Sequence, residues 1–339
     1  MIGQSTQMIG ESPAYLDLMD QISRAAGQER PLLVIGERGT GKELIGERLH
    51  YLSHRWNRDY IKMNCAALPE TLLESELFGY EPGAFTGATK RRIGRFERAD
   101  EGTLFLDEIA TTSAAAQEKL LRVIEYGEFE RVGGSETLKT DTRVIGATNI
   151  DLPRAADMGL FRHDLLDRLA FDVITVPPLR ARKEDIMTLA TFFGSAMARE
   201  QEWPFFPGFT DDAVELLMDH DWPGNVRELK NVVERAVYRA WDAEAPVSDI
   251  ILDPFDSPYR PSQMMPTRLA QTAGQLSASA GEASGQSVGT GLKDQVAALE
   301  KSLLEKAMDT AKQNQRTAAK ALSLSYDQLR HLLKKHQLI

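Results

Sequence analysis

The sequence of 339 residues predicts an α/β fold, in which a parallel β-sheet with helices on both faces precedes a smaller helical subdomain and an all-α C-terminal module. Three observations lead to this prediction. Short apolar runs alternate with helical patterns, a later stretch has helical periodicity alone, and a linker-like segment precedes the C-terminal residues. We expect the α/β subdomain over residues 1–180, the helical subdomain over 181–252, a flexible linker over 253–291 and the C-terminal module over 292–339.

The predicted strands are short runs of nearly continuous apolar residues. Strands of a parallel sheet are covered by helices on both faces and therefore need apolar side chains at almost every position. The runs occupy residues 31–36, 59–64, 102–108, 142–149 and 171–176. From residue 183 to about residue 243, apolar residues recur at helical spacing, which predicts the helical subdomain.

Residues 253–291 have the composition of a linker. They contain 15 Pro, Gly or Ser residues in 39 positions and 5 charged residues. Such a stretch buries too little apolar surface to offset the entropy lost on ordering, so we expect it to be flexible. Residues 292–339 carry a net charge of +4, whereas the whole chain carries −10. A basic module on an acidic body is typical of nucleic-acid binding, and on charge alone a solvated helical surface is an equal alternative.

Composition excludes several other classes of protein. Cys65 is the single cysteine, which excludes an internal disulfide framework and fits a reducing compartment. The six histidines have no metal-ligand spacing with this cysteine, so we expect no structural zinc site. The sequence has no apolar run approaching the roughly 18 residues that span a bilayer, and its N-terminus has no signal pattern. We therefore expect a cytoplasmic protein without a membrane span.

A glycine-rich loop follows the first predicted strand and opens a helix. Its sequence GERGTGKE offers backbone N–H groups and a helix N-terminus to a phosphate, and Lys42 is placed to reach the terminal phosphates. Glu43 stands where such loops usually have the Ser or Thr that binds magnesium. The predicted nucleotide-binding residues of this loop are Gly36, Glu37, Arg38, Gly39, Thr40, Gly41, Lys42 and Glu43.

Two further strand ends complete the predicted site. The third predicted strand ends in Asp107 and Glu108. We assign Asp107 to hold Mg²⁺ through water, and Glu108 to orient and polarise the attacking water. The fourth predicted strand ends in Thr148 and Asn149, polar groups able to sense the γ-phosphate. The three strand ends together predict an ATP hydrolase that uses ATP and Mg²⁺.

The motif GAFTGA lies between the second and third predicted strands. With this motif the sequence resembles the bacterial enhancer-binding proteins, the AAA+ activators of sigma-54 RNA polymerase. The resemblance covers residues 9–240 and the C-terminus, and includes the stretches 161–173, 177–186 and 222–231. It implies an AAA+ fold with a helical lid, a Glu at the end of the phosphate loop, and a mobile loop that contacts sigma-54. The residues of this loop are Gly83, Ala84, Phe85, Thr86, Gly87 and Ala88.

The resemblance assigns roles to residues at matching positions. Arg162 and Arg168 resemble the arginines that reach the γ-phosphate bound by a neighbouring subunit, which implies a homo-oligomeric ring, typically a hexamer. Arg227 resembles the second sensor of the helical lid. Asn64 resembles the residue whose hydrogen bond to the catalytic glutamate, here Glu108, links the nucleotide state to the GAFTGA loop.

The C-terminal module has the spacing of a helix-turn-helix. Residues 292–313 form a predicted amphipathic helix, 315–322 a second helix, 323–325 a turn, and 326–335 the helix that would enter the major groove of DNA. The turn has Ser323 where the family usually has Gly. The residues predicted to contact bases or phosphates are Arg316, Thr317, Tyr326, Gln328, Arg330, His331, Lys334 and Lys335.

These features predict an ATP-driven transcription activator. We expect it to bind upstream enhancer DNA, to form a ring and to remodel the closed complex of sigma-54 RNA polymerase. The first predicted strand begins at residue 31, which leaves no room for a preceding sensor domain, so we expect regulation by a separate inhibitor protein. Two other classes share parts of the pattern. An AAA+ unfoldase would need a hydrophobic pore loop instead of GAFTGA, and a simple DNA-binding repressor would leave the ATPase elements unexplained.

Overall fold

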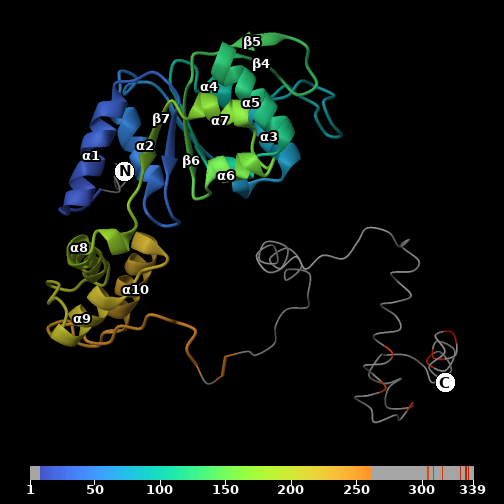
Figure 1. Ribbon diagram of the computed structural model, residues 1–339. Helices are drawn as coiled ribbons and strands as arrows, with labels where there is room; N and C mark the ends of the chain where they lie inside the picture. The colour runs from blue at the N-terminus through green and yellow to red at the C-terminus, as the bar shows by residue number, and fades with distance from the viewer. Residues whose placement is uncertain are drawn as a thin grey trace. The chain divides into compact units, whose positions relative to one another are not determined.

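The computed structural model of the protein describes residues 8–257, 259 and 260, together with Leu304, Met308, Gln315, Leu329, Leu333 and Lys335. The chain divides into two units, Met1–Ser257 and Pro258–Ile339. In the described part of the first unit, an α/β subdomain is followed by a helical subdomain (Figure 1).

Within residues 8–257, five parallel strands form one sheet in the order β2-β3-β6-β1-β7. The strands are β1 (Leu32–Ile35), β2 (Tyr60–Asn64), β3 (Thr103–Asp107), β6 (Arg143–Thr148) and β7 (Asp172–Thr175). The strand before the phosphate loop, β1, lies between β6 and β7, so both of its edges are hydrogen-bonded. The predicted α/β fold with a parallel sheet is confirmed.

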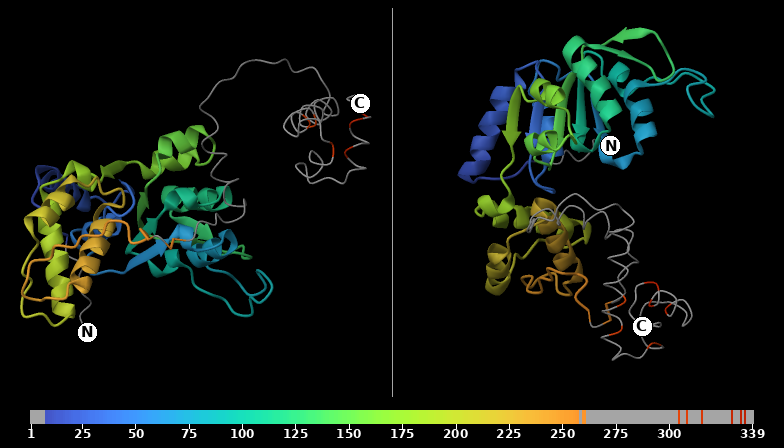
Figure 2. Two further views of the ribbon diagram at one scale, coloured as in Figure 1. Left: turned by 90° about the horizontal axis from the view of Figure 1, so that it is seen from below. Right: turned by 45° about the vertical axis from the view of Figure 1, so that its right-hand side comes forward.

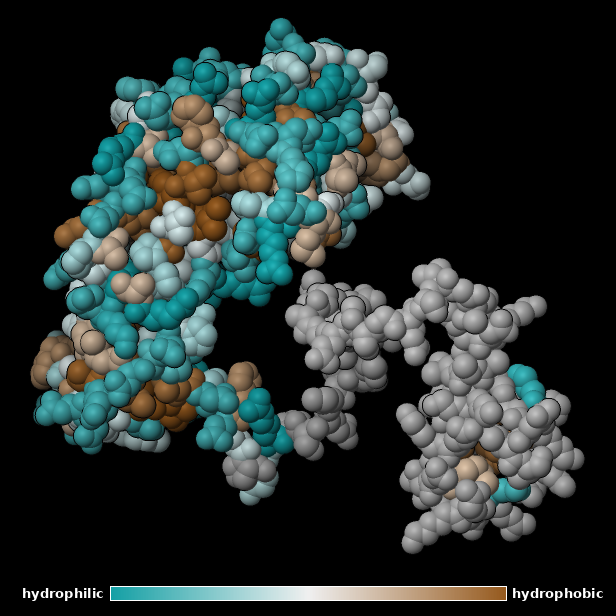
Figure 3. All heavy atoms as spheres, viewed as in Figure 1, coloured by the Kyte–Doolittle hydropathy of each residue, from teal (hydrophilic) through white to brown (hydrophobic). Residues whose placement is uncertain are grey.

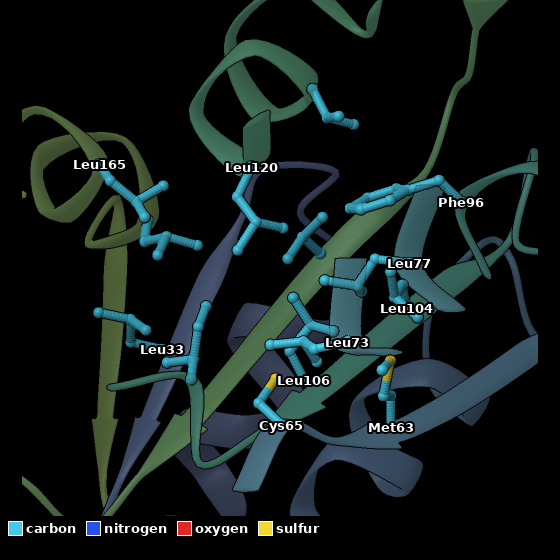
Figure 4. Packing of buried hydrophobic residues seen from close by; sticks show 14 of the residues in the cluster. Leu33, Met63, Cys65, Leu73, Leu77, Phe96, Leu104, Leu106, Leu120 and Leu165 are labelled. Atoms are coloured by element: carbon cyan, nitrogen blue, oxygen red, sulfur yellow. The ribbon is translucent and has the colours of Figure 1, made fainter. Parts of the chain in front are cut away.

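Helices cover both faces of this sheet, because successive side chains of a strand point to opposite sides. On one face, Leu32 and Val34 pack with α1 (Pro13–Ala26) and α2 (Lys42–Tyr51). On the other face, Leu33 belongs to a larger core that Figure 4 shows with Leu104, Leu106 and their neighbours. The helices of that face are α3 (Glu70–Phe78), α4 (Arg95–Arg98), α5 (Ala114–Tyr126), α6 (Leu152–Asp157) and α7 (His163–Leu169).

The helical subdomain has a core of its own, and Figure 2 shows it as a separate layer of helices. Its helices are α8 (Asp185–Glu200), α9 (Asp211–Asp219) and α10 (Asn225–Arg239). Trp222 is fully buried in this core, and its indole N–H donates to the carbonyl of Leu217 at 2.9 Å. The apolar stripe of α10, which includes Leu229 and Val233, faces the same core, as its helical periodicity predicts. The 3₁₀ turns η1 (Cys65–Ala67), η2 (Ile109–Thr111) and η3 (Leu179–Ala181) follow β2, β3 and β7.

Two connected segments extend the α/β subdomain. One is the loop between α3 and α4, which contains the GAFTGA motif. The other is an antiparallel hairpin of β4 (Glu128–Glu130) and β5 (Thr137–Lys139), which the sequence patterns did not predict because each strand has three residues. Figure 1 shows both on the same side of the subdomain. The backbone N–H of Val132 in the hairpin donates to the carbonyl of Gly79 at 2.9 Å, so the two segments are joined at their bases.

Hydrophilic residues cover most of the face seen in Figure 3, and hydrophobic residues gather in smaller separate patches. Among the helices that the structure describes, none is long and apolar enough to cross a membrane. Of the residues predicted to contact DNA, Lys335 is described and is exposed. The others lie outside the described residues, so the helix-turn-helix stays a prediction; they are Arg316, Thr317, Tyr326, Gln328, Arg330, His331 and Lys334.

Candidate active site

The phosphate loop lies between β1 and α2, and glycines shape it. Gly39 and Gly41 have φ angles of +78° and +95°, in the left-handed region that strains residues with a side chain. Lys42 closes the loop, because its Nζ donates to the carbonyls of Gly36 at 2.9 Å and Glu37 at 3.2 Å. Burial lowers the pKa of Lys42, which is 7% exposed. The N-terminus of α2 therefore opens on a cradle suited to phosphate.

Two carboxylates follow β3 beside this loop. Asp107 Oδ1 accepts the backbone N–H of Glu108 at 3.0 Å, and Glu108 has a φ angle of +53°, a conformation that clusters at functional sites. The side-chain amide of Asn149 is oriented so that both its nitrogen and its oxygen have hydrogen-bond partners. The nitrogen donates to Glu108 Oε2 at 2.7 Å, and the oxygen accepts from Arg38 Nε at 3.2 Å. Asn149, at the end of β6, thus connects the predicted water-activating carboxylate with the phosphate loop.

In the structure Asn64 contacts Asp107, and its hydrogen bond to Glu108 stays a prediction. Its Nδ2 donates to Asp107 Oδ2 at 3.3 Å and not to Glu108, while its Oδ1 accepts the N–H of Ala66 at 2.9 Å. The reason is the strand register, which pairs Asn64 with Asp107 at the ends of β2 and β3, one residue before Glu108. The end of β2 is therefore tied to the predicted metal-binding carboxylate, and Asn149 holds Glu108.

The donors beside the phosphate loop suit a magnesium ion that binds with a nucleotide. Among the described residues, no group of three or more His, Cys, Asp or Glu side chains is arranged to hold a metal by itself. Mg²⁺ keeps several waters and binds through one or two carboxylates together with substrate phosphates. Asp107 next to a phosphate cradle fits this pattern. Glu43, at the position where such loops usually have a magnesium-binding Ser or Thr, forms an ion pair with Lys62, with 2.7 Å between Glu43 Oε1 and Lys62 Nζ.

These groups line one cavity of ≈ 790 Å³, a volume within the usual range for small-molecule sites. Part of its wall is apolar, from Ile9 and from residues of α8 and α10 such as Leu189, Phe193 and Val226. A nucleotide has the matching division between base and triphosphate. The predicted site residues that line the cavity are Arg38, Gly39, Thr40, Gly41, Lys42, Glu43, Asn64, Asp107, Glu108, Asn149 and Arg227.

Three predicted nucleotide-binding residues do not line this cavity. Thr148 is fully buried, and its hydroxyl oxygen accepts the N–H of Ile150 at 3.0 Å. The N–H of Gly36 donates to the carbonyl of Thr148 at 3.1 Å, which fastens the phosphate loop to β6. The Glu37 carboxylate accepts hydrogen bonds from both terminal nitrogens of the Arg180 guanidinium, at 2.6 and 2.8 Å. These contacts support the shape of the loop, and the predicted contacts of the three residues with nucleotide stay predictions.

The helical subdomain rests on the phosphate loop at Glu37 and Gly39. Asn225, at the start of α10, donates to Glu37 Oε2 at 3.0 Å. Hydrogen bonds from Arg180 and then from Asn225 lower the pKa of Glu37 to about 2. A Cβ at Gly39 would lie 2.2 Å from the carbonyl oxygen of Gly224. The sequence carries no signal for the contacts of Arg180 and Asn225 with Glu37, because these residues stand 143 and 188 positions from it and no spacing relates them.

The two arginines predicted to act on a neighbouring subunit lie at α7, outside the cavity. Arg162 pairs with Asp164 at 2.7 Å, and Arg168 pairs with Glu125 at 2.7 Å. Their side chains are 39% and 56% exposed. Neither arginine lines the cavity of its own chain, and both are accessible from outside.

The GAFTGA loop is a tight turn with an exposed aromatic ring. The N–H of Gly83 donates to the carbonyl of Ala88 at 2.8 Å, and both Gly83 and Gly87 have positive φ angles. Phe85 is 44% exposed, and its ring contacts that of Tyr80 edge-on, with 4.9 Å between centroids. This geometry presents an aromatic side chain between two glycines, where a partner can cover it.

The base of this loop is anchored by an arginine that sequence analysis did not single out. The side chain of Arg131 is 2% exposed and pairs with Glu97 at 2.6 Å and with Glu81 at 2.8 Å. The hydrogen bond from Arg131 to Glu97 raises the pKa of Arg131, so its charge is retained. The number of charged residues around GAFTGA was the one feature of the sequence that pointed to ion pairs there. Their pairing across 34 and 50 residues depends on the fold.

Comparison with known proteins gives consistent matches. A family model described as a sigma-54 interaction domain matches residues 8–175, and one described as an AAA+ ATPase lid domain matches residues 180–253. The chain is 53% identical over 331 residues to the Psp operon transcriptional activator of Escherichia coli (strain K12), and the match covers 98% of each chain.

Further similar proteins match a large part of this chain or nearly all of it. The Nif-specific regulatory protein of Azotobacter vinelandii is 52% identical over 240 residues, which are 71% of this chain and 46% of that protein, so the chain spans about half the length of this relative. The crystal structure of NtrX from Brucella abortus in complex with ATP has a TM-score of 0.68 and 30% sequence identity. This match covers 98% of the present chain and 70% of NtrX.

Proposed function

The chain belongs to the sigma-54-dependent transcriptional activators with an AAA+ ATPase, and we propose that it uses ATP hydrolysis to remodel the closed complex of sigma-54 RNA polymerase. The observation that carries this proposal is the assembly of Lys42, Asp107, Glu108 and Arg227 around one cavity. The likeness to the Psp operon activator over the whole chain favours phage-shock genes, which respond to envelope stress, as its targets.

In the proposed reaction, the phosphate loop holds the triphosphate and Glu108 acts on water. Lys42 neutralises charge on the terminal phosphates, and Glu108 orients and polarises the water that attacks the γ-phosphorus. Mg²⁺, when bound beside Asp107, neutralises charge on the phosphate oxygens. The hydrogen bond of 2.7 Å from Asn149 fixes the Glu108 carboxylate in place. The products are ADP and phosphate.

The proposal includes a homo-oligomeric ring, typically a hexamer. An arginine from a neighbouring subunit stabilises the charge that develops on the transferred phosphoryl group. Arg162 and Arg168 suit this role because they lie outside their own cavity and their ion pairs are at the surface. Surface ion pairs are worth little and are readily exchanged for another partner. Arg227 acts within the subunit, from the lid helix α10.

The same proposal connects the nucleotide with the GAFTGA loop. The hydrogen bond between Asn64 and Asp107 joins the active site to the end of β2, and η1 and α3 lead from there to the loop. Arg131 holds the loop base through Glu81 and Glu97. If a change at the γ-phosphate moves Asp107, the movement therefore reaches the loop that contacts sigma-54 through Asn64, η1 and α3.

We infer the remaining partners from the sequence and from the Psp operon relative. Residues 292–339, with their net charge of +4, suit binding to upstream enhancer DNA. The ATPase is regulated by a separate inhibitor protein of the phage shock protein A type, and the protein works in the cytoplasm, where sigma-54 RNA polymerase acts.

Thr86→Ala tests whether the GAFTGA loop carries the mechanical output. Thr86 lies at an exposed turn away from the cavity, so the variant is expected to hydrolyse ATP near the wild-type rate. It should fail to bind sigma-54 in the presence of ADP and a metal fluoride, and should fail to open a sigma-54 promoter. ATPase rate, sigma-54 binding and open-complex yield are measured on one purified sample.

Thr191→Ala, at an exposed position of the lid helix α8, is the matched control and should open promoters normally. Promoter opening by Thr86→Ala at the wild-type level would contradict the role of this loop. An ATP-dependent unfolding of protein substrates, without any effect on sigma-54 promoters, would favour the unfoldase alternative.

A further inference from the structure

A buried carboxylate on the lid holds the N-terminal segment of the described chain. Asp185, the first residue of α8, is 0% exposed. Its Oδ1 accepts the backbone N–H groups of Glu11 at 2.6 Å and Ser12 at 2.8 Å. Its Oδ2 accepts the hydroxyl of Ser12 at 2.8 Å. Residues 8–12, which we call the strap, are thus fastened to the lid by a residue more than 170 positions away.

The strap forms part of the wall of the nucleotide cavity. Met8 and Ile9 line the cavity, and Ile9 packs in the same apolar cluster as Leu189, Phe193 and Val226 of the lid. The phosphate loop and the carboxylates line the polar part of the cavity. The apolar part, formed jointly by strap and lid, is the part suited to a purine base.

The surroundings of Asp185 require its negative charge. Arg182 lies beside it, with 3.9 Å between Arg182 Nη1 and Asp185 Oδ2, and the Arg182 side chain is 5% exposed. Within the described part of the chain, Arg182 Nε has no hydrogen-bond partner. Burial lowers the pKa of Arg182. A buried guanidinium that also lines the cavity would be uncompensated without the Asp185 carboxylate.

We propose that Asp185 is a positioning residue that fastens the strap to the lid, so that the two apolar walls close together on the base of the bound nucleotide. The inference rests on the proposed function, because the base is that of ATP. Asp185 does not line the cavity, so it acts through the strap and not on the nucleotide itself. It acts by holding residues 8–12 in place before the nucleotide arrives, which removes the entropy cost of ordering them on binding.

The effect of Asp185 is therefore confined to the base end of the site. Ser12→Ala removes one of its hydrogen bonds, and Asp185→Asn removes its charge while retaining its shape. Both variants of the full chain should bind ATP about tenfold more weakly, with KM raised far more than kcat is lowered. Inorganic triphosphate, which has no base, should bind to both variants as it binds to the wild type.

Ser113→Ala is the matched control. Ser12 and Ser113 both cap a helix through a serine oxygen that accepts a backbone N–H, from Tyr15 at 3.2 Å and from Ala116 at 3.3 Å. The Ser113 variant loses the same kind of cap without touching the strap, so its affinity for ATP should equal that of the wild type. Thermal denaturation of each variant shows that it is folded, and Ser12→Ala carries the test if Asp185→Asn fails to fold.

Two results would overturn the inference: unchanged ATP affinity in Ser12→Ala, or equal losses for ATP and for inorganic triphosphate. The second result would mean that the whole site is damaged. Failure of the proposed function is distinguishable, because it would appear as a wild-type chain that binds ATP and does not hydrolyse it. The binding comparison among the variants would still decide the role of Asp185.

Discussion

Gly39→Ala is predicted to separate the lid from the phosphate loop. Gly39 has a φ angle of +78°, and a left-handed conformation costs a residue with a Cβ about 1 kcal/mol. The new Cβ would lie 2.2 Å from the carbonyl oxygen of Gly224 and 3.0 Å from Cβ of Arg227, whereas ordinary contacts begin at 3.4 Å. Both backbones resist the shift, so the lid and the loop must move apart by about 1 Å.

The functional consequence follows from the position of this contact. Arg227 lies on α10 three residues after Gly224, and Lys42 stands three residues after Gly39, so the displacement separates two groups that we propose act on the same phosphates. A misplacement of about 1 Å costs on the order of 10²-fold in rate. We therefore expect kcat/KM for ATP to fall by about that factor or more, together with a lower melting temperature.

The assay is steady-state ATP hydrolysis with thermal denaturation of the same samples. Gly208→Ala is the control, since Gly208 has a φ angle of +88° with nothing within 4 Å of the new Cβ. It should show the backbone cost of about 1 kcal/mol and normal hydrolysis. If Gly39→Ala has the same melting temperature as Gly208→Ala and hydrolyses ATP at the wild-type rate, the close contact between loop and lid does not determine the geometry of the active site.

Three further predictions concern the chemistry and the electrostatics. Glu108→Ala should bind ATP normally and lose at least about 10²-fold in turnover, measured as phosphate release; wild-type turnover would contradict its role. Arg168→Ala should be inactive alone and regain part of its turnover in mixed rings with Glu108→Ala, whereas mixed rings without this gain would exclude an arginine supplied in trans. Hydrogen bonds from Arg180 and then from Asn225 lower the pKa of Glu37 to about 2, so the stabilisation by these contacts is complete above about pH 4.5 and is lost as the pH falls toward 2. Melting temperatures over that range should fall less steeply in Arg180→Ala than in the wild type, and equal slopes would refute the pairing.

The nucleotide site could be predicted from sequence because its parts are local. The loop that ends in Lys42 directly follows an apolar strand, and Asp107 and Glu108 directly follow another. The carboxyl ends of parallel strands meet at one edge of the sheet, so these residues had to converge. Proximity along the chain and the apolar pattern of the strands were therefore enough to predict the α/β fold, the phosphate loop and the carboxylate pair.

The partners of these residues depended on tertiary structure. Strand order and register decided that Asn64 faces Asp107 and that Asn149 holds Glu108. The packing of the lid decided that Glu37 is held by Arg180. Register and packing join residues more than 40 positions apart, and no periodicity in the sequence encodes such pairs.

The sequence by itself thus determined which chemistry this protein carries, because phosphate binding and water activation need a few residue types at short spacing. Only the tertiary structure decided how that chemistry is supported. Asp185 shows the difference, because on the chain it is one acidic residue at a helix start, and in the fold it is a fully buried acceptor for Glu11 and Ser12. A buried carboxylate is defined by what surrounds it, and those surroundings exist only after the lid and the N-terminal segment have packed together.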